Sequence, residues 1–136
     1  MLVIDTNILA CLLIERDRTG KVQDLYRADA DWHSEEFILV EFSNVLATYA
    51  RTGDLTATRA RGLLDEAIKR LSGGLIAVPH AEALAAANSY QVSAYDARFL
   101  AAAESRGVKL VTEDETLRKA APPLTQSVDD VLATIK

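Results

Sequence analysis

The chain has 136 residues, of which 49% are hydrophobic and 26% are charged. A chain of this length buries roughly two-thirds of the surface that its unfolded form exposes, so we expect one domain spanning residues 1–136. Its 15 basic and 20 acidic residues give a net charge of −5, which argues against a protein that holds nucleic acid through a broad basic face.

Cysteine usage and hydropathy predict where the protein resides. The single cysteine, Cys11, has no partner for an intrachain disulfide, as is typical of a reducing compartment. The longest apolar run, Ile8 to Ile14, has seven residues, whereas a membrane span needs roughly 20. The run lacks the basic flank of a signal peptide. We therefore expect a cytoplasmic protein without a membrane anchor.

Short apolar runs alternate with segments of helical periodicity along the chain. Strands are predicted at 2–4, 75–78, 108–112 and 124–126, and the residues around Trp32 fit either a strand or a loop. Helices are predicted at 8–15, 21–28, 36–52, 56–71, 80–87, 93–106, 114–120 and 128–135. Thr6 or Asn7 is expected to cap the first helix. Strands separated by helices predict an α/β fold whose mainly parallel sheet is covered on both faces.

Most catalytic arrangements are absent from the sequence. His33 and His80 lack metal-ligand spacing and lie in no nucleophile motif, so we expect ordinary surface or core side chains. Gly73 and Gly74 predict a turn, and neither GxGxxG nor GxxxxGK[ST] occurs. The residues that remain as candidates for chemistry are acidic: Asp5, Glu41, Asp96 and Asp114.

Two of these acids follow predicted strands. Asp5 comes directly after the first strand, and Asp114 lies two residues after the strand that ends near Thr112. Ligands of parallel sheets bind beyond the carboxyl ends of the strands, so both carboxylates are expected at one sheet edge. Purely structural roles remain open: Asp5 complements a helix dipole, Asp96 forms a capping box with Ser93, and Asp114 caps the next helix.

Glu41 fits a structural role less well. It borders the apolar stripe of its helix, three residues after Ile38 and four before Val45, on a flank that it shares with Asn44 and Thr48. Because burying an unpaired carboxylate is costly, Glu41 requires a partner. The other acids between Arg27 and Arg51, a stretch without basic residues, are expected on a solvated face; they are Asp29, Asp31, Glu35 and Glu36.

If the four candidate acids converge, they require a counter-charge. Two carboxylates about 4 Å apart repel by about 4 kcal/mol at an effective dielectric constant near 20. Oxygen ligands without His or Cys suit Mg²⁺ or Mn²⁺. Two such ions roughly 3.5–4 Å apart would hold the attacking and leaving oxygens of a phosphodiester and activate a water. Setting the four acids aside leaves a charge of 15 − 16 = −1, which removes the main objection to a nucleic-acid substrate.

Four segments in order along residues 3–117 resemble the motifs of PIN-domain nucleases. They are Val3-Ile4-Asp5-Thr6-Asn7-Ile8-Leu9, Glu41-Phe42-Ser43-Asn44-Val45-Leu46, the YDA-containing segment 93–104, and 110–117 with its T-x-D element. The resemblance implies that Asp5, Glu41, Asp96 and Asp114 are the catalytic metal ligands. It also implies that the Thr112 hydroxyl supports them and that Asn44 lies next to them. Thr6 and Asn7 are expected to shape the turn, and Glu113 and Glu115 are candidates for the acidic rim.

The size of the chain most resembles the stand-alone VapC-like toxins of type II toxin–antitoxin pairs. That resemblance implies a three-layer α/β/α sandwich and an endoribonuclease that depends on Mg²⁺ or Mn²⁺, with one or two ions per site. It further implies a homodimer and a cognate antitoxin that inserts a peptide into or beside the acidic site. We expect hydrolysis of RNA by metal-activated water to leave a 5′-phosphate and a 3′-hydroxyl. Substrate contacts are expected from Arg16, Arg18, Lys21 and Arg98.

Two other classes of α/β protein with acidic strand ends require motifs that this sequence lacks. A receiver domain requires an adjacent acidic pair after the first strand, and a phosphatase with an Asp nucleophile requires DxD there; Asp5-Thr6-Asn7 supplies neither. The stronger alternative is a PIN-like module that binds metal or a partner protein with weak or no catalysis. Such a scaffold would have no reason to retain four mutually repelling acids.

Overall fold

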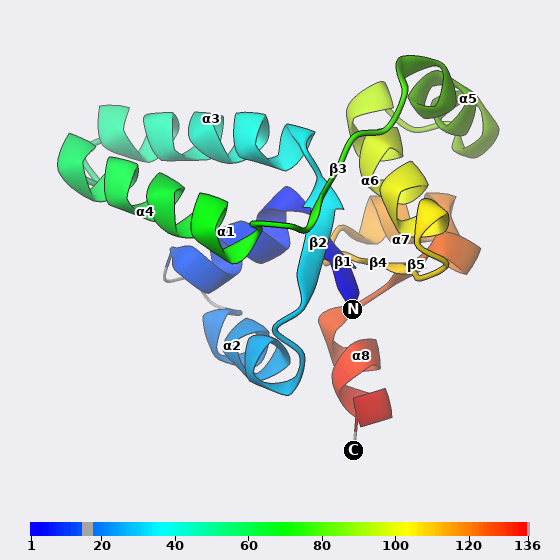
Figure 1. The fold of residues 1–136 in the computed structure, drawn as a ribbon, viewed down its shortest axis with the longest axis horizontal. Helices are drawn as coiled ribbons and strands as arrows, with labels where there is room; N and C mark the ends of the chain where they lie inside the picture. The colour runs from blue at the N-terminus through cyan, green and yellow to red at the C-terminus, as the bar shows by residue number, and fades with distance from the viewer. Residues whose placement is uncertain (15–17, 136) are drawn as a thin grey trace.

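The computed structural model describes residues 1–14 and 18–135 (Figure 1). Five parallel strands form one sheet in the order β3-β2-β1-β4-β5. They are β1 (Leu2–Ile4), β2 (Trp32–Glu35), β3 (Leu75–Ile76), β4 (Leu110–Val111) and β5 (Thr125–Gln126). The undecided segment at Trp32 is therefore a strand. It lies between β1 and β3, with Leu2 opposite Trp32 and Ser34 opposite Leu75.

Helices cover both faces of this sheet. They are α1 (Thr6–Leu13), α2 (Thr19–Ala28), α3 (Phe37–Arg51), α4 (Ala57–Arg70), α5 (His80–Tyr90), α6 (Ala94–Ser105), α7 (Glu115–Ala120) and α8 (Val128–Ile135), with a 3₁₀ turn, η1, at Pro122–Leu124. In Figure 1, α1, α3 and α4 lie on one side of the sheet, and α5 and α6 lie on the other. The prediction of a three-layer α/β/α sandwich with a parallel central sheet is confirmed.

The core explains why the strands are short and apolar. Val3 and Ile4 of β1 and Leu110 and Val111 of β4 are completely buried, as central parallel strands are when helices cover both faces. The buried face of α6 includes small residues, Ala97, Ala102 and Ala103 among them, which allow the helix to approach the sheet closely. The N-terminus of α6 is thereby held beside the carboxyl ends of the strands.

The ends of several elements differ from the sequence predictions. Asp5, rather than Thr6 or Asn7, caps α1, because its extended backbone lets the carboxylate accept a hydrogen bond from the main-chain N of Ile8 at 3.2 Å. Helix α5 continues to Tyr90, three residues beyond its predicted end, and stops where Gln91 adopts a left-handed conformation with φ 55°. Residue 15, the predicted end of the first helix, lies outside the described residues.

The prediction of a solvated acidic face is wrong for Glu35, which is only 1% exposed. Its position on the inner strand β2 places it under the helices, and its carboxylate accepts hydrogen bonds from the main-chain N of Phe37 at 2.8 Å and of Val78 at 2.6 Å. These donors satisfy a carboxylate that water does not reach. Asp31 and Glu36 are exposed, as predicted.

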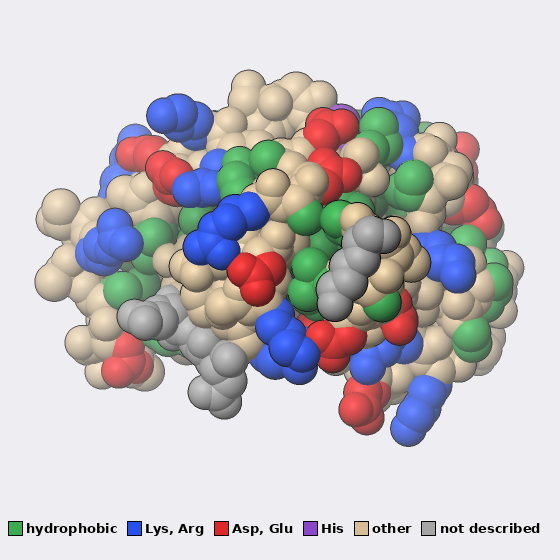
Figure 2. Space-filling model, turned by 90° about the horizontal axis from the view of Figure 1, so that it is seen from below, with side chains coloured by type: hydrophobic (Ala, Val, Ile, Leu, Met, Phe, Trp, Pro, Cys, Tyr) green, Lys and Arg blue, Asp and Glu red, His purple; other side chains and the backbone are tan. Residues whose placement is uncertain are grey.

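Charges of both signs lie interspersed on the face shown in Figure 2, which views the molecule of Figure 1 from below. Ion pairs among the exposed charges of the described residues include Lys21 with Asp129 at 2.7 Å and Arg27 with Asp24 at 2.7 Å. Within residues 1–14 and 18–135, no helix combines the length and the hydropathy that crossing a membrane requires.

Candidate active site

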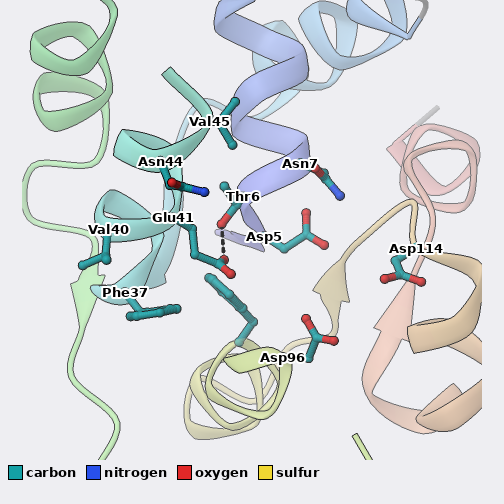
Figure 3. Close-up of a pocket in the computed structure, with 11 residues that line it drawn as sticks. Asp5, Thr6, Asn7, Phe37, Val40, Glu41, Asn44, Val45, Asp96 and Asp114 are labelled. Atoms are coloured by element: carbon teal, nitrogen blue, oxygen red, sulfur yellow. Dashed lines mark hydrogen bonds between the residues drawn. The ribbon is translucent and has the colours of Figure 1, made fainter. Parts of the chain in front are cut away.

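A pocket of about 360 Å³ opens at the carboxyl ends of β1 and β4 (Figure 3). It is lined by Asp5, Thr6, Asn7, Phe37, Val40, Glu41, Asn44, Val45, Asp96, Phe99 and Asp114. All four candidate acids are in this set, although they come from four separate segments of the chain. Asn44 is also on the pocket wall, one turn after Glu41, and its side chain is exposed. The structure therefore brings together the residues that the sequence motifs singled out.

Asp5 lies at the buried end of the pocket. One carboxylate oxygen caps α1, and the other accepts a hydrogen bond from the Thr112 hydroxyl. Burial raises the pKa of Asp5 to about 6, and the charges of Asp96 and Asp114 act in the same direction, while the hydrogen bonds from Thr112 and Ile8 oppose the rise. Asp5 is thus a carboxylate that retains a proton more readily than an exposed one.

Glu41 has the partner that its place on the helix required. The Thr6 hydroxyl donates a hydrogen bond to Glu41 Oε1 at 2.6 Å, drawn as a dashed line in Figure 3. Thr6 therefore does more than shape the turn, because it joins the start of α1 to α3. Sequence reasoning missed this link, since the two residues are 35 positions apart.

The helix-capping roles considered for the other two acids are also present. The Ser93 hydroxyl accepts a hydrogen bond from the main-chain N of Asp96 at 3.0 Å. Asp114 caps α7 by accepting from the main-chain N of Leu117 at 3.1 Å. Burial, followed by the charge of Asp114, raises the pKa of Asp96. Local capping and placement in the pocket thus coincide, because Asp114 caps α7 itself and the Ser93 cap holds Asp96 in the first turn of α6.

Thr112 connects two of the pocket acids. Its hydroxyl donates to Asp5 and accepts a hydrogen bond from the main-chain N of Asp114 at 3.1 Å, and the side chain is fully buried. Arg118 holds the same segment from outside by donating to the Thr112 carbonyl oxygen at 2.8 Å. The hydroxyl therefore fixes the spacing between the first and the last of the four acids.

We expect Thr112→Val to lower the free energy of unfolding by about 1–3 kcal/mol, because it leaves a buried carboxylate short of a donor and an amide without its acceptor. The matched control is Thr116→Val, at an exposed position on α7, for which a change within about 0.5 kcal/mol is expected. Urea denaturation of both variants measures the difference. Equal stability of the two variants would contradict the linking role of the Thr112 hydroxyl.

The two acids beside Asp114 do not belong to this pocket. Glu113 accepts hydrogen bonds from Arg18 at 2.8 Å and from Arg118 at 3.3 Å, which neutralise it on the neighbouring surface. Glu115 is exposed and lines the same outer surface as Glu113. The expectation that either residue adds to the acidic rim is therefore not supported by their positions.

The cations expected to contact a substrate are largely engaged elsewhere. Lys21 and Arg18 pair with Asp129, and Arg16 lies outside the described residues. Arg98 donates to the Val78 carbonyl oxygen at 3.0 Å. Among the described residues, no Lys or Arg lines the acidic pocket.

Sequence reasoning missed the contact that orients α6. Arg98 Nη1 lies 3.7 Å from Glu35 Oε2, and Arg98 Nη2 donates to His80 Nδ1 at 2.5 Å. These interactions join α6 to the end of β2 and to the start of α5. Because Asp96 lies two residues before Arg98, this network helps to position an acid of the pocket. No local sequence pattern indicates this network, because His80 lies 18 positions from Arg98 and Glu35 lies on a strand of polar residues.

The carboxylate oxygens of the pocket are the type of ligand that a hard divalent cation prefers. Four carboxylates supply only oxygen ligands, and no basic side chain in the described part of the pocket balances them. Figure 3 shows the carboxylates of Asp5, Asp96 and Asp114 directed toward the same space, whereas Glu41 is turned toward Thr6. As these side chains lie, no three His, Cys, Asp or Glu residues among those described are close enough together to hold one ion. Binding of one ion by three of these acids would therefore require side-chain rotation.

Comparisons with known proteins agree with the fold and with the family that the sequence resembles. Ribonuclease VapC3 of Pyrobaculum aerophilum is 30% identical over 126 residues, which cover 90% of this chain and 96% of that protein. The crystal structure of PAE2754 from Pyrobaculum aerophilum matches with a TM-score of 0.75 at 22% identity, covering 98% of this chain and 95% of that one. The crystal structure of FitAcB from Neisseria gonorrhoeae matches with a TM-score of 0.71 at 15% identity, covering 94% and 98%. The PIN domain family model matches residues 2–122, and the chain therefore belongs to the PIN domain family.

Proposed function

We propose that the protein is an endoribonuclease that depends on Mg²⁺ or Mn²⁺ and acts as the toxin of a toxin–antitoxin pair. The observation that carries this proposal is the convergence of four carboxylates from four segments on one pocket, without a basic residue among the described residues that line it. The relative named Ribonuclease VapC3 supports RNA as the substrate class. A cognate antitoxin and a second copy of this chain are the proposed protein partners.

Asp5, Glu41, Asp96 and Asp114 would hold one or two ions in this pocket. Such ions supply activation of a water and neutralisation of charge on the phosphodiester. Thr112 orients Asp5 through its hydrogen bond, and Thr6 restrains Glu41. Asn44 offers an exposed amide on the pocket wall, next to Glu41. The raised pKa of Asp5 means that metal binding displaces a proton, so affinity for the ion rises with pH up to about pH 6.

A second candidate function is a PIN-like module that binds metal or a partner protein with weak or no catalysis. The observation that favours it is the wide placement of the acids, since no three such residues in the described part of the chain converge on one ion. Metal binding without RNA cleavage would support this alternative.

The experiment that tests the proposed function is cleavage of a mixed RNA pool by the purified protein. Reactions contain Mg²⁺ or Mn²⁺, or a chelator, and are run beside Asp96→Asn and the control Asp65→Asn, which changes an exposed carboxylate on α4. We expect metal-dependent cleavage by the wild type and by the control, and none by Asp96→Asn. Cleavage that persists in chelator or in Asp96→Asn would indicate a contaminating nuclease.

Metal binding is also expected to raise the melting temperature. A ligand present at 100 times its dissociation constant stabilises a protein by about 2.7 kcal/mol, which corresponds to roughly 10 °C for a domain of this size. The increase should disappear in Asp114→Asn and persist in Asp65→Asn. Thermal denaturation with and without Mn²⁺ measures it, and an equal increase in all three proteins would exclude the acidic pocket as the binding site.

A further inference from the structure

Two aromatic rings stack at the edge of the acidic pocket. The ring centroids of Phe37 and Tyr95 are 5.4 Å apart, and the ring planes differ by 6°. Phe37 is the first residue of α3 and lines the pocket one turn before Glu41. Tyr95 lies on α6 directly before Asp96. The stacked pair therefore joins the two helices that supply these acids.

Tyr95 is exposed to an extent that core packing does not explain, whereas Phe37 is half-buried beneath it. Tyr95 is 61% exposed and Val40, one turn after Phe37 and also on the pocket wall, is 60% exposed. The core beneath is filled by other rings, since Phe42 and Phe99 are buried. Phe37 and Val40 on the pocket wall and Tyr95, stacked on Phe37, thus form an apolar rim, which we call the aromatic rim, beside a pocket that also contains the four acids.

We propose that the aromatic rim is a stacking site for a nucleobase next to the phosphodiester that is cleaved. This inference rests on the proposed function. Single-stranded RNA is recognised largely by stacking of unpaired bases on aromatic side chains, and every base has a face that can stack. A base is joined through one ribose to its phosphate, so a phosphodiester at the acids places a neighbouring base within one nucleotide of the pocket wall.

The electrostatics of the pocket favour the same occupant. The described residues that line the pocket include no Lys or Arg, so these residues offer the RNA no ionic contact there. Apart from the metal ions, contacts with the RNA inside the pocket then come from uncharged groups, and the near-parallel rings present a flat surface for a further planar group. A purine, with its larger face, is expected to bind the aromatic rim better than a pyrimidine.

The test is a double-mutant cycle, in which substitution of the Tyr95 side chain is combined with removal of one base of the RNA. Short single-stranded oligonucleotides carrying the cleavage site are prepared intact and with one abasic ribose on either side of the cut. The values of kcat/KM are compared for the wild type, Tyr95→Phe and Tyr95→Leu. Leu84→Ala, which changes a 59% exposed apolar residue on α5 outside the pocket lining, is the matched control. Quenching of 2-aminopurine at the flanking position reports stacking independently of cleavage.

On intact RNA, Tyr95→Leu is expected to lower kcat/KM roughly 5- to 150-fold, with most of the effect in KM, because one stacked base contributes about that factor. On the abasic RNA that lacks the stacked base, the wild type and Tyr95→Leu should be cleaved equally. Tyr95→Phe and Leu84→Ala should behave like the wild type, and 2-aminopurine should be quenched by the wild type but not by Tyr95→Leu.

An equal loss on intact and abasic RNA would overturn the proposal, because it would mean that Tyr95 only positions Asp96. Unchanged cleavage by Tyr95→Leu would overturn the proposal as well. If that variant cleaves RNA normally but loses binding of a protein partner, the aromatic rim contacts the partner and not the RNA. If the wild type cleaves none of the RNAs, the proposed function itself fails. Cleavage without coupling between Tyr95 and the base refutes the stacking site alone.

Discussion

Asp5→Asn is expected to stabilise the metal-free protein at pH 7 and to abolish RNA cleavage. The carboxylate is 7% exposed and faces the charges of Asp96 and Asp114, so ionising it in the folded state is unfavourable. Asparagine removes this charge and keeps an oxygen that caps α1, because Asn and Asp are comparable caps, and its NH₂ group can donate to the Thr112 hydroxyl in place of the hydrogen bond that Asp5 accepts from it. A substitution that only damaged the fold would instead lower both stability and activity.

The sign of the pH dependence follows from the pKa of Asp5, which is about 6 in the folded protein and 3.8 in the unfolded reference. Between these values the folded state binds more protons than the unfolded state, so the free energy of unfolding falls as the pH rises from about 4 to about 6. The contribution of Asp5 to this fall is at most about 3 kcal/mol, since one pKa unit corresponds to about 1.4 kcal/mol. Loss of the charge–dipole interaction at the helix start offsets about 0.3–1 kcal/mol of the gain in Asp5→Asn.

Urea denaturation at several pH values between 4 and 7 measures the difference in stability between the wild type and Asp5→Asn. We expect the difference to be small near pH 4 and to favour the variant by about 1–3 kcal/mol at pH 7. Saturating Mn²⁺ should reverse the order, because the ion stabilises only the wild type. The kcat/KM for RNA should fall at least about 100-fold. A variant that is less stable than the wild type at pH 7 without metal would contradict the proposed electrostatic strain.

Features that depend on neighbouring residues could be predicted from the sequence. The alternation of apolar runs and helical segments indicated the parallel sheet, and the caps at Ser93 and Asp114 are formed by residues three positions apart. The order of the four motifs along the chain indicated which acids share the pocket. A single motif does not indicate that its acid lies near the others. Local rules therefore gave the framework, and the resemblance to a family gave the grouping.

Features that depend on contacts between distant segments could not be predicted. Strand β2 includes His33, Ser34 and Glu35, which have no apolar pattern, yet Ser34 and Glu35 are buried. The Ser34 hydroxyl donates to the Ile4 carbonyl oxygen at 2.7 Å, and Glu35 accepts from Val78, 43 positions away. A polar residue is stable inside a protein when its hydrogen bonds are satisfied, and those partners are defined only by the fold.

The Glu35–Arg98 contact pairs a buried carboxylate with a largely buried guanidinium. Glu35 is 1% exposed and Arg98 is 18% exposed at the side chain, so removing the arginine leaves a buried carboxylate without its opposite charge. We expect Arg98→Met to lower the free energy of unfolding by about 3–5 kcal/mol. Arg106→Met, on the exposed residue that follows α6, is the matched control and should change stability by less than about 0.5 kcal/mol.

A double-mutant cycle with Glu35→Gln separates the loss of the charge partner from a loss of packing. Glutamine keeps one acceptor for the amides of Phe37 and Val78 and removes the buried charge, so the double variant should be more stable than the sum of the two single effects predicts. Strict additivity would mean that Glu35 and Arg98, whose charged groups are 3.7 Å apart, are not energetically coupled.

Because Arg98 lies two residues after Asp96, Arg98→Met should also weaken Mn²⁺ binding under conditions where the variant remains folded, while the control Arg106→Met should not. Unchanged affinity for Mn²⁺ in folded Arg98→Met would show that the ion pair stabilises α6 without positioning the acid that this helix contributes to the pocket.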